Sequence, residues 1–173
     1  MMGDERGLLS RLLTAAAPGL ILFSAVLLMI TPLKVFGHSV PLPLAPFIVI
    51  FLYAAYAPNA LPAPITFAAG LLQDLLFASP LGLWATVFLS LHYAVLAQHD
   101  YLKGRLHRVI AVLFAMLVAA VGAILWGLSS LVFAEVLPVR PLAVQLLVTI
   151  LMYPACAYVF LTVRRSERGP SPA

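Results

Sequence analysis

Six long apolar stretches alternate along the chain with short segments that hold all but one of the charged residues and half of the prolines and glycines. The stretches lie at about 12–31, 42–57, 62–77, 80–98, 109–133 and 142–163. Uncharged apolar stretches of this length are typical of helices that cross a lipid bilayer. The pattern predicts an all-α fold, a polytopic transmembrane bundle of about six helices. We expect one integral membrane domain over 1–173, ending in a short tail at 164–173.

The stretches differ in how well they fit a bilayer. Val109–Phe133 holds 25 residues without a charge, and a helix of that length reaches about 37 Å. In the second stretch, prolines crowd the start and leave only Phe47–Ala57 uninterrupted. The third is also short, and Pro64 lies in its first turn. Two arrangements therefore fit: six spans, or four spans and a re-entrant hairpin built from segments two and three, which other protein must cover.

Composition and charge support a membrane location. The chain is 64% hydrophobic and 9% charged, whereas a soluble domain is about one quarter charged. The ten lysines and arginines predict its orientation, because eight fall on one side of the predicted membrane and two on the other. The eight are Arg6, Arg11, Lys103, Arg105, Arg108, Arg164, Arg165 and Arg168, and the two are Lys34 and Arg140. Both termini are then cytoplasmic, and the net charge of +4 needs no nucleic acid to explain it.

Asp74 is the only acidic residue within an apolar stretch. A carboxylate at the bilayer centre costs about 2.5–3.5 kcal/mol on insertion scales, so such a residue has a function or a partner. Asp74 could hold an ion or a proton, or it could contact a helix of this chain or of another protein. Its place near the end of segment three lowers the cost and favours the helix contact. Its side of the segment also holds Thr66, Gly70, Gln73 and Phe77, and such a stripe of polar and small side chains usually faces protein.

Segment five carries a small residue at every fourth position. This ladder consists of Ala111, Ala115, Ala119, Ala123 and Gly127. Small side chains let a neighbouring helix approach closely, so the ladder predicts a packing face whose partner the sequence does not name. After segment three, Ser79 and Pro80 match a helix start, with serine as the N-cap and proline at the first helical position.

Catalytic and metal-binding patterns are not found in the sequence. Cys156 is the single cysteine, so neither an intrachain disulfide nor a Cys/His metal site is expected. Neither a nucleophile elbow nor a glycine-rich phosphate loop occurs. We therefore expect no enzyme activity and no cofactor. An intramembrane enzyme built on Asp74 would need a second carboxylate facing it.

The stretch Gly70-Leu-Leu-Gln-Asp74-Leu-Leu-Phe-Ala-Ser-Pro80-Leu-Gly82-Leu-Trp resembles the signature region of the MreD family of bacterial rod shape-determining membrane proteins. The resemblance consists of a glycine, an aspartate four residues later, and a Pro-Leu-Gly beginning six residues after the aspartate. Chain length, the helical layout and the basic loop and tail fit as well. Candidate helix-contact or motif residues are Gly70, Gln73, Asp74, Pro80, Gly82, Ala115 and Ala119.

This resemblance implies a non-catalytic scaffold subunit of the cell-elongation machinery in the bacterial inner membrane. Such a subunit would bind the bitopic protein MreC. Through MreC it would help couple cytoplasmic MreB filaments to peptidoglycan synthesis by RodA and a class B penicillin-binding protein. The many prolines between residues 41 and 64 depart from the family pattern. The resemblance therefore does not predict how the second and third helices are arranged.

An alternative function follows from the fold that the resemblance implies. The family fold is similar to the substrate-binding subunits of energy-coupling-factor vitamin transporters. Interrupted helices such as segments two and three can line a binding site near the bilayer midplane. A polar substrate would, however, need several converging polar groups, and the apolar stretches supply few.

Overall fold

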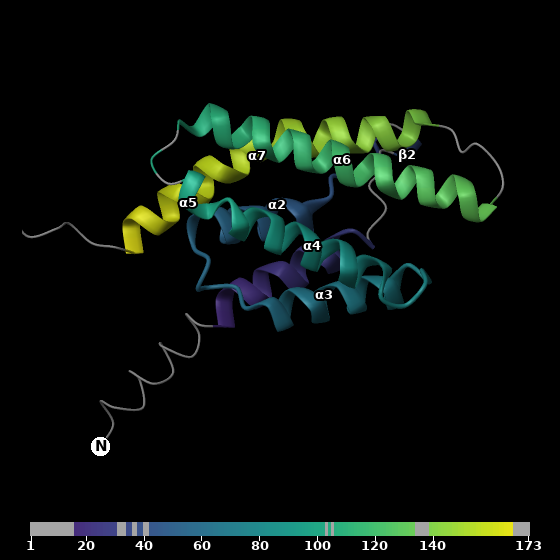
Figure 1. Cartoon of the computed structure of the whole chain (residues 1–173), viewed down its shortest axis with the longest axis horizontal. Helices are drawn as coiled ribbons and strands as arrows, with labels where there is room; N and C mark the ends of the chain where they lie inside the picture. Colours follow the sequence, from purple (N-terminus) through teal and green to yellow (C-terminus); the bar gives the residue numbers. More distant parts are fainter. Residues whose placement is uncertain are drawn as a thin grey trace, which may run out of the picture. The chain divides into compact units, whose positions relative to one another are not determined.

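The computed structural model describes residues 16–30, 34–35, 38–39, 42–102, 104, 106–133 and 139–167. Helices make up almost all of these residues (Figure 1). The first is Ala16–Leu28, purple in Figure 1. The others are α2 (Ala45–Tyr56), α3 (Ala63–Leu76), α4 (Leu83–Ala97), α5 (His99–Leu102), α6 (His107–Phe133) and α7 (Val139–Glu167). The prediction of an all-helical fold is confirmed.

Smaller differences from the expected layout lie between and after the helices. Two residue pairs, β1 (Lys34–Val35) and β2 (His38–Ser39), form a short antiparallel ladder between the first two helices. Helix α7 continues to Glu167, so the first residues of the predicted tail are helical. The remainder of that tail, and the predicted cytoplasmic cations at 6, 11, 103, 105 and 168, lie outside the described residues.

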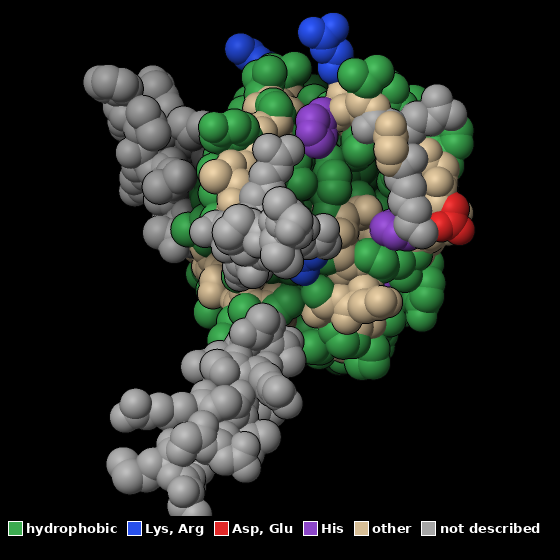
Figure 2. Space-filling model, turned by 90° about the vertical axis from the view of Figure 1, so that its left-hand side faces the viewer, with side chains coloured by type: hydrophobic (Ala, Val, Ile, Leu, Met, Phe, Trp, Pro, Cys, Tyr) green, Lys and Arg blue, Asp and Glu red, His purple; other side chains and the backbone are tan. Residues whose placement is uncertain are grey.

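Two helices, α6 and α7, are long and apolar enough to cross a membrane, over His107–Gly127 and Val139–Arg164. The first helix, α2, α3 and α4 are apolar but shorter. Hydrophobic side chains cover most of the coloured surface in Figure 2, and few lysines, arginines or acidic residues interrupt them. A surface of this kind is stable against lipid rather than water. The chain is a membrane protein.

The helices group into two compact units: the first helix with α2–α5, and the β1–β2 ladder with α6 and α7. The single domain expected from the sequence stays a prediction. In the first unit, α3 and α2 each pack along α4, whereas α2 and α3 contact each other far less. The closely packed hairpin is therefore α3–α4, and not one of the second and third segments.

Helix α2 is short but almost completely buried. Nine of its 12 residues are buried, on all sides of the helix. Phe47 makes edge-to-face contacts with Trp84 and Phe88 of α4, at ring-centroid distances of 6.3 and 5.7 Å. A helix that is apolar all round has to be enclosed by other elements. The proline-flanked segment, too short to span on its own, is thus a buried helix that packs along α4.

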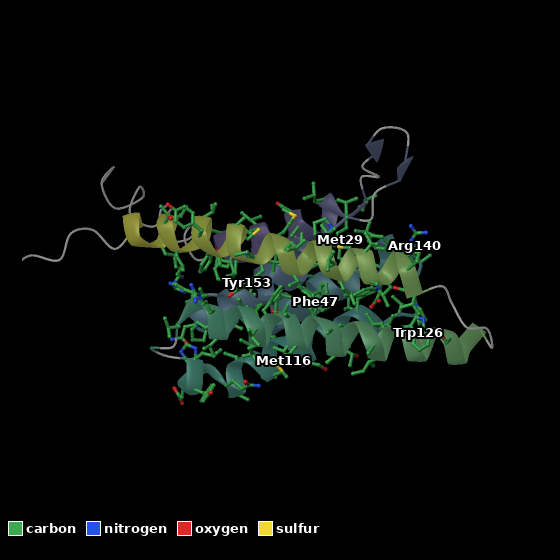
Figure 3. The ribbon with its side chains drawn as sticks, turned by 90° about the horizontal axis from the view of Figure 1, so that it is seen from above. Met29, Phe47, Met116, Trp126, Arg140 and Tyr153 are labelled. Atoms are coloured by element: carbon green, nitrogen blue, oxygen red, sulfur yellow. The ribbon has the colours of Figure 1, made fainter. Side chains whose placement is uncertain are left out.

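In the second unit, α6 and α7 lie side by side (Figures 1 and 3). The segment just before α2 is held on α7 by hydrogen bonds. The Leu44 N–H donates to Thr149 Oγ1 at 2.9 Å, and Gln145 Nε2 donates to the Leu42 carbonyl at 3.1 Å. These bonds satisfy backbone groups of a proline-rich segment that has no ladder of its own, as an apolar environment requires.

Candidate functional site

The closest helix contact in the first unit lies at Gly70 on α3. A Cβ atom placed on Gly70 would lie 2.3 Å from Ala85 Cα and 2.6 Å from Ala85 N on α4. Both are backbone atoms, so no side-chain movement could relieve the overlap. Gly70 and Ala85 are both buried, and Ala85 is the smallest residue that keeps a Cβ there. The motif glycine is therefore where the two helix backbones meet.

One turn further along α3, Asp74 fastens the start of α4. Its side chain is fully buried, with 0% exposed. Oδ2 accepts a hydrogen bond from the Gly82 N–H at 2.8 Å, and Oδ1 accepts one from the Trp84 N–H at 2.9 Å. Oδ1 also accepts one from Ser79 Oγ at 2.9 Å. These N–H groups lie at the N-terminus of α4, where the first N–H groups lack helical partners and the helix dipole favours a negative group.

These bonds change the interpretation of Ser79 and Pro80. The prediction that they start the next helix is wrong: α4 begins at Leu83, and Gly82 is its N-cap. Gly82 has φ +95 and supplies no side-chain cap. The Asp74 carboxyl group provides the cap from the preceding helix instead, and it also takes the Ser79 hydroxyl. Pro80 lies exposed in the turn between the helices.

The same turn ends α3 with a residue in the left-handed region. Ala78 has φ +49, and the N–H of Ser79 donates to the Asp74 carbonyl at 3.1 Å, four positions before Ala78. This is the long hydrogen bond of a Schellman motif, in which glycine usually holds the left-handed position. Alanine there pays a steric cost of about 1–2 kcal/mol. The two left-handed residues, Ala78 and Gly82, fold the turn back onto Asp74.

Replacing Ala78 by glycine should therefore stabilise the protein. Relief of the left-handed strain outweighs the extra backbone entropy of glycine, so we expect the free energy of unfolding to rise by about 1 kcal/mol. Unfolding in mixed micelles at increasing SDS measures it. The matched control is Ala120→Gly in the middle of α6, which should lower stability by about 1 kcal/mol. A loss of stability with Ala78→Gly would contradict the strain argument.

Other polar side chains of the predicted stripe on α3 are buried without a hydrogen-bond partner. They are Thr66, with Oγ1 unpaired, and Gln73, with Oε1 unpaired. On α4, His92 is 2% exposed, and its Nδ1 is also unpaired. Buried polar atoms are normally satisfied by protein or by ordered water. Of the stripe predicted on α3, Thr66, Gly70, Gln73 and Asp74 are buried, whereas Phe77 is exposed just after the helix ends. The sequence gave no sign that the buried polar atoms would stay unpaired.

On α6, the buried stripe runs beside the predicted small-residue ladder and does not coincide with it. Ile110, Phe114 and Val118 are buried at four-residue spacing, and Gly122 continues the stripe. A Cβ on Gly122 would meet Leu146 Cδ1 of α7 at 2.5 Å, so the two helices approach closely there.

Aromatic stacking supports the same contact between α6 and α7. Phe114 stacks on Tyr153 at a centroid distance of 4.4 Å, and Figure 3 shows Tyr153 on α7 directed toward α6. The ladder residues lie to one side. Ala115 is half-buried and Ala119 is exposed. Within the second unit, α6 therefore uses its larger residues and Gly122 for α7.

The residues brought together at the α3–α4 turn fix the start of α4 through hydrogen bonds to Asp74. Among the described residues, no group of three or more His, Cys, Asp or Glu side chains could hold a metal ion. The Asp74 carboxyl group accepts hydrogen bonds from backbone and hydroxyl donors of its own chain. The sequence singled out the motif residues, whereas Ala78 and Ala85 gave no signal, because alanine is common throughout the chain.

Comparison with known proteins identifies the family to which the chain belongs. No curated protein and no solved structure matches the chain, so the similarity to vitamin-transporter subunits stays a prediction. The model of one protein family, described as rod shape-determining protein MreD, matches residues 10–163 of the 173. The match contains the whole stretch from Gly70 to Trp84 and every described helix except the last turn of α7. The chain therefore belongs to the MreD family of rod shape-determining proteins.

Proposed function

We propose that this protein is a non-catalytic scaffold subunit of the rod-shape machinery in the bacterial inner membrane. It binds the transmembrane helix of an MreC-like bitopic protein. Through that partner it helps couple MreB filaments to peptidoglycan synthesis by RodA and a class B penicillin-binding protein. Family membership supports the role in rod-shape determination. The described residues lie almost entirely in apolar helices, so helix faces and short connections are the surfaces available for a partner.

The observation that carries the proposal is the exposed part of the ladder on α6. Ala119 and Ala123 are exposed, beside the buried stripe that faces α7. Small side chains on a lipid-exposed helix allow a second helix to approach until the backbones nearly touch, where dispersion and weak Cα–H···O contacts are strongest. In contrast, Gly70 and Asp74 are buried against α4 of the same chain. The partner face is therefore assigned to α6, and the motif on α3 is assigned to internal packing.

The orientation follows from the basic residues and remains part of the proposal. Both termini and the loop at 99–108 face the cytoplasm. The closed end of the α3–α4 hairpin then points toward the other side. MreB-linked contacts would use the basic, cytoplasmic end of the helices.

Ala119→Leu should weaken recovery of MreC when the two proteins are co-purified from detergent. The leucine side chain separates the helices at the point of closest approach, and we expect recovery to fall several-fold. The matched control is Ala120→Leu, the neighbouring exposed alanine on α6, which lies about 100° around the helix. Ala120→Leu should leave recovery unchanged. Equal recovery with both variants and the unaltered protein would remove the ladder from the proposal.

The alternative function, a substrate-binding subunit of a vitamin-type transporter, rests on the unpaired polar atoms of the first unit. Thr66, Gln73 and His92 offer hydroxyl, amide and imidazole groups among buried helices. A ligand that paired with these atoms would stabilise the folded protein. The scaffold function is favoured because family membership supports a role in rod-shape determination, whereas the alternative is supported only by these unpaired atoms and an expected fold similarity.

A further inference from the structure

The closed end of the α3–α4 hairpin, residues 75–82, is apolar and exposed. We refer to these eight residues as the apex. Leu75 is 68% and Leu81 is 73% exposed, and Leu76 and Phe77 are also exposed. A turn that faces water normally carries polar or charged side chains. The apex carries one polar side chain, Ser79, and its hydroxyl already donates to Asp74.

The hairpin is too short to bring this apex to the far side of a bilayer. Helix α4 has 15 residues and α3 has 14, which gives lengths of roughly 21–22 Å. The turn adds about one helical pitch, roughly 5 Å. The sum, about 27 Å, is less than the ~30 Å thickness of the hydrocarbon core, and any tilt shortens its reach further. In comparison, α6 and α7 have 27 and 29 residues, or roughly 40 Å each.

The opposite end of the hairpin is polar. The depth that the apex reaches in the bilayer is therefore measured from this end. Helix α4 is followed by Gln98, His99 and Asp100, and the turn before α3 carries Asn59. His99 Nδ1 lies 3.0 Å from the Ala55 carbonyl at the end of α2. Polar groups of this kind lie at the membrane surface rather than in hydrocarbon. Between residues 60 and 97, Asp74 and His92 are the only acidic, basic or histidine side chains, and both are buried.

Several backbone N–H groups in and next to the apex are paired within the chain. In hydrocarbon each unpaired N–H or C=O group costs several kcal/mol, so irregular backbone has to be satisfied internally. The N–H groups of Phe77, Ser79 and Leu83 donate to carbonyls of Gln73, Asp74 and Pro80, within 3.1 Å. Those of Gly82 and Trp84 donate to the Asp74 carboxyl group, and Pro80 has no N–H.

We infer that the apex of the α3–α4 hairpin is immersed in the bilayer, with Leu75, Phe77 and Leu81 in contact with lipid acyl chains. The hairpin enters from the side that holds its polar end and stops below the opposite headgroups. Asp74 makes this depth tolerable, because it pairs the N–H groups that water would otherwise have to reach. The occupant of the exposed apolar surface is therefore lipid.

A fluorescent probe at position 81 tests this inference. Leu81→Cys in a Cys156→Ala background is labelled with the environment-sensitive dye NBD. The labelled chain is reconstituted alone into vesicles of phosphatidylethanolamine and phosphatidylglycerol. Leu81 is exposed, so its replacement should not disturb folding. We expect blue-shifted emission, strong quenching by lipids brominated on the acyl chain, and weak quenching by aqueous iodide.

The matched control is Arg140→Cys in the same background, because Arg140 is charged and exposed near the start of α7 (Figure 3). Iodide should quench the probe at position 140 several-fold more strongly than the probe at position 81. Equal quenching by iodide at the two positions would overturn the inference. The apex would then face water in the isolated protein, which is expected of a surface that binds another protein. This outcome is independent of MreC binding, so it leaves the proposed function untouched.

Discussion

Substituting Gly70 by alanine is expected to destabilise the protein by about 3 kcal/mol, the upper part of the usual range for overpacking a core. The added methyl group would lie 2.3 Å from Ala85 Cα, so α3 and α4 have to move apart along their whole contact. Cores adjust easily when the end of a flexible side chain is in the way, but a backbone atom cannot rotate aside. Unfolding in mixed micelles at increasing SDS measures the loss.

The control for this substitution is Gly127→Ala on α6. A Cβ at Gly127 would have nothing within 4 Å, so the same chemical change there should be neutral or stabilising by up to about 1 kcal/mol, the helix-propensity gain of alanine. The contrast between the two substitutions isolates the close approach of the helices. Equal stability of the Gly70→Ala variant and the unaltered protein would show that α3 and α4 lie further apart than described.

The second large effect is expected for Asp74→Leu, which removes the acceptor at the start of α4. The N–H groups of Gly82 and Trp84 and the hydroxyl of Ser79 would lose their partner. Each buried donor left unpaired costs about 1–3 kcal/mol, and breaking a buried network is among the most damaging single changes. We expect a loss of about 3–5 kcal/mol and a lower yield of folded protein in the membrane.

Two graded variants separate the bonds of Asp74. Asp74→Asn keeps one oxygen acceptor and should cost less than Asp74→Leu. Ser79→Ala removes one side-chain bond and leaves both backbone N–H groups paired, so it should cost about 1 kcal/mol. The order of stability is then Ser79→Ala above Asp74→Asn above Asp74→Leu. If Asp74→Leu folded normally and lost only its MreC partner, the capping role would be wrong and Asp74 would belong to the partner face.

These expectations affect how variants of the motif are to be interpreted. Gly70 and Asp74 are completely enclosed within the chain. A cell-shape defect from changing either residue would therefore report loss of folded protein. A defect from changing Ala119, which is exposed, would instead report loss of a partner. Measuring the amount of folded protein in the membrane beside the shape defect distinguishes the two causes.

The sequence by itself determined the membrane class, the helical fold, the family and the approximate position of every described helix except the four-residue α5, which lies in a predicted loop. Hydropathy is a property of each residue and its neighbours in the chain, and a helix in lipid forms wherever about 20 apolar residues follow one another. The helix at Val109–Phe133 was expected within two residues of the observed α6, His107–Phe133. The motif from Gly70 to Gly82 marked the residues around which the first unit is built.

Only the tertiary structure decided which helix each face meets. The sequence left open whether Asp74 contacts a helix of this chain or of a partner. The hydrogen bonds that Asp74 accepts from the Gly82 and Trp84 N–H groups show that it contacts the start of α4. The sequence also did not show which side of α6 contacts α7, the ladder that contains Ala119 or the neighbouring stripe that contains Phe114. The physical reason is that helix contacts depend on rotation and register between segments distant in sequence. Uniformly apolar helices carry little periodic pattern to indicate either.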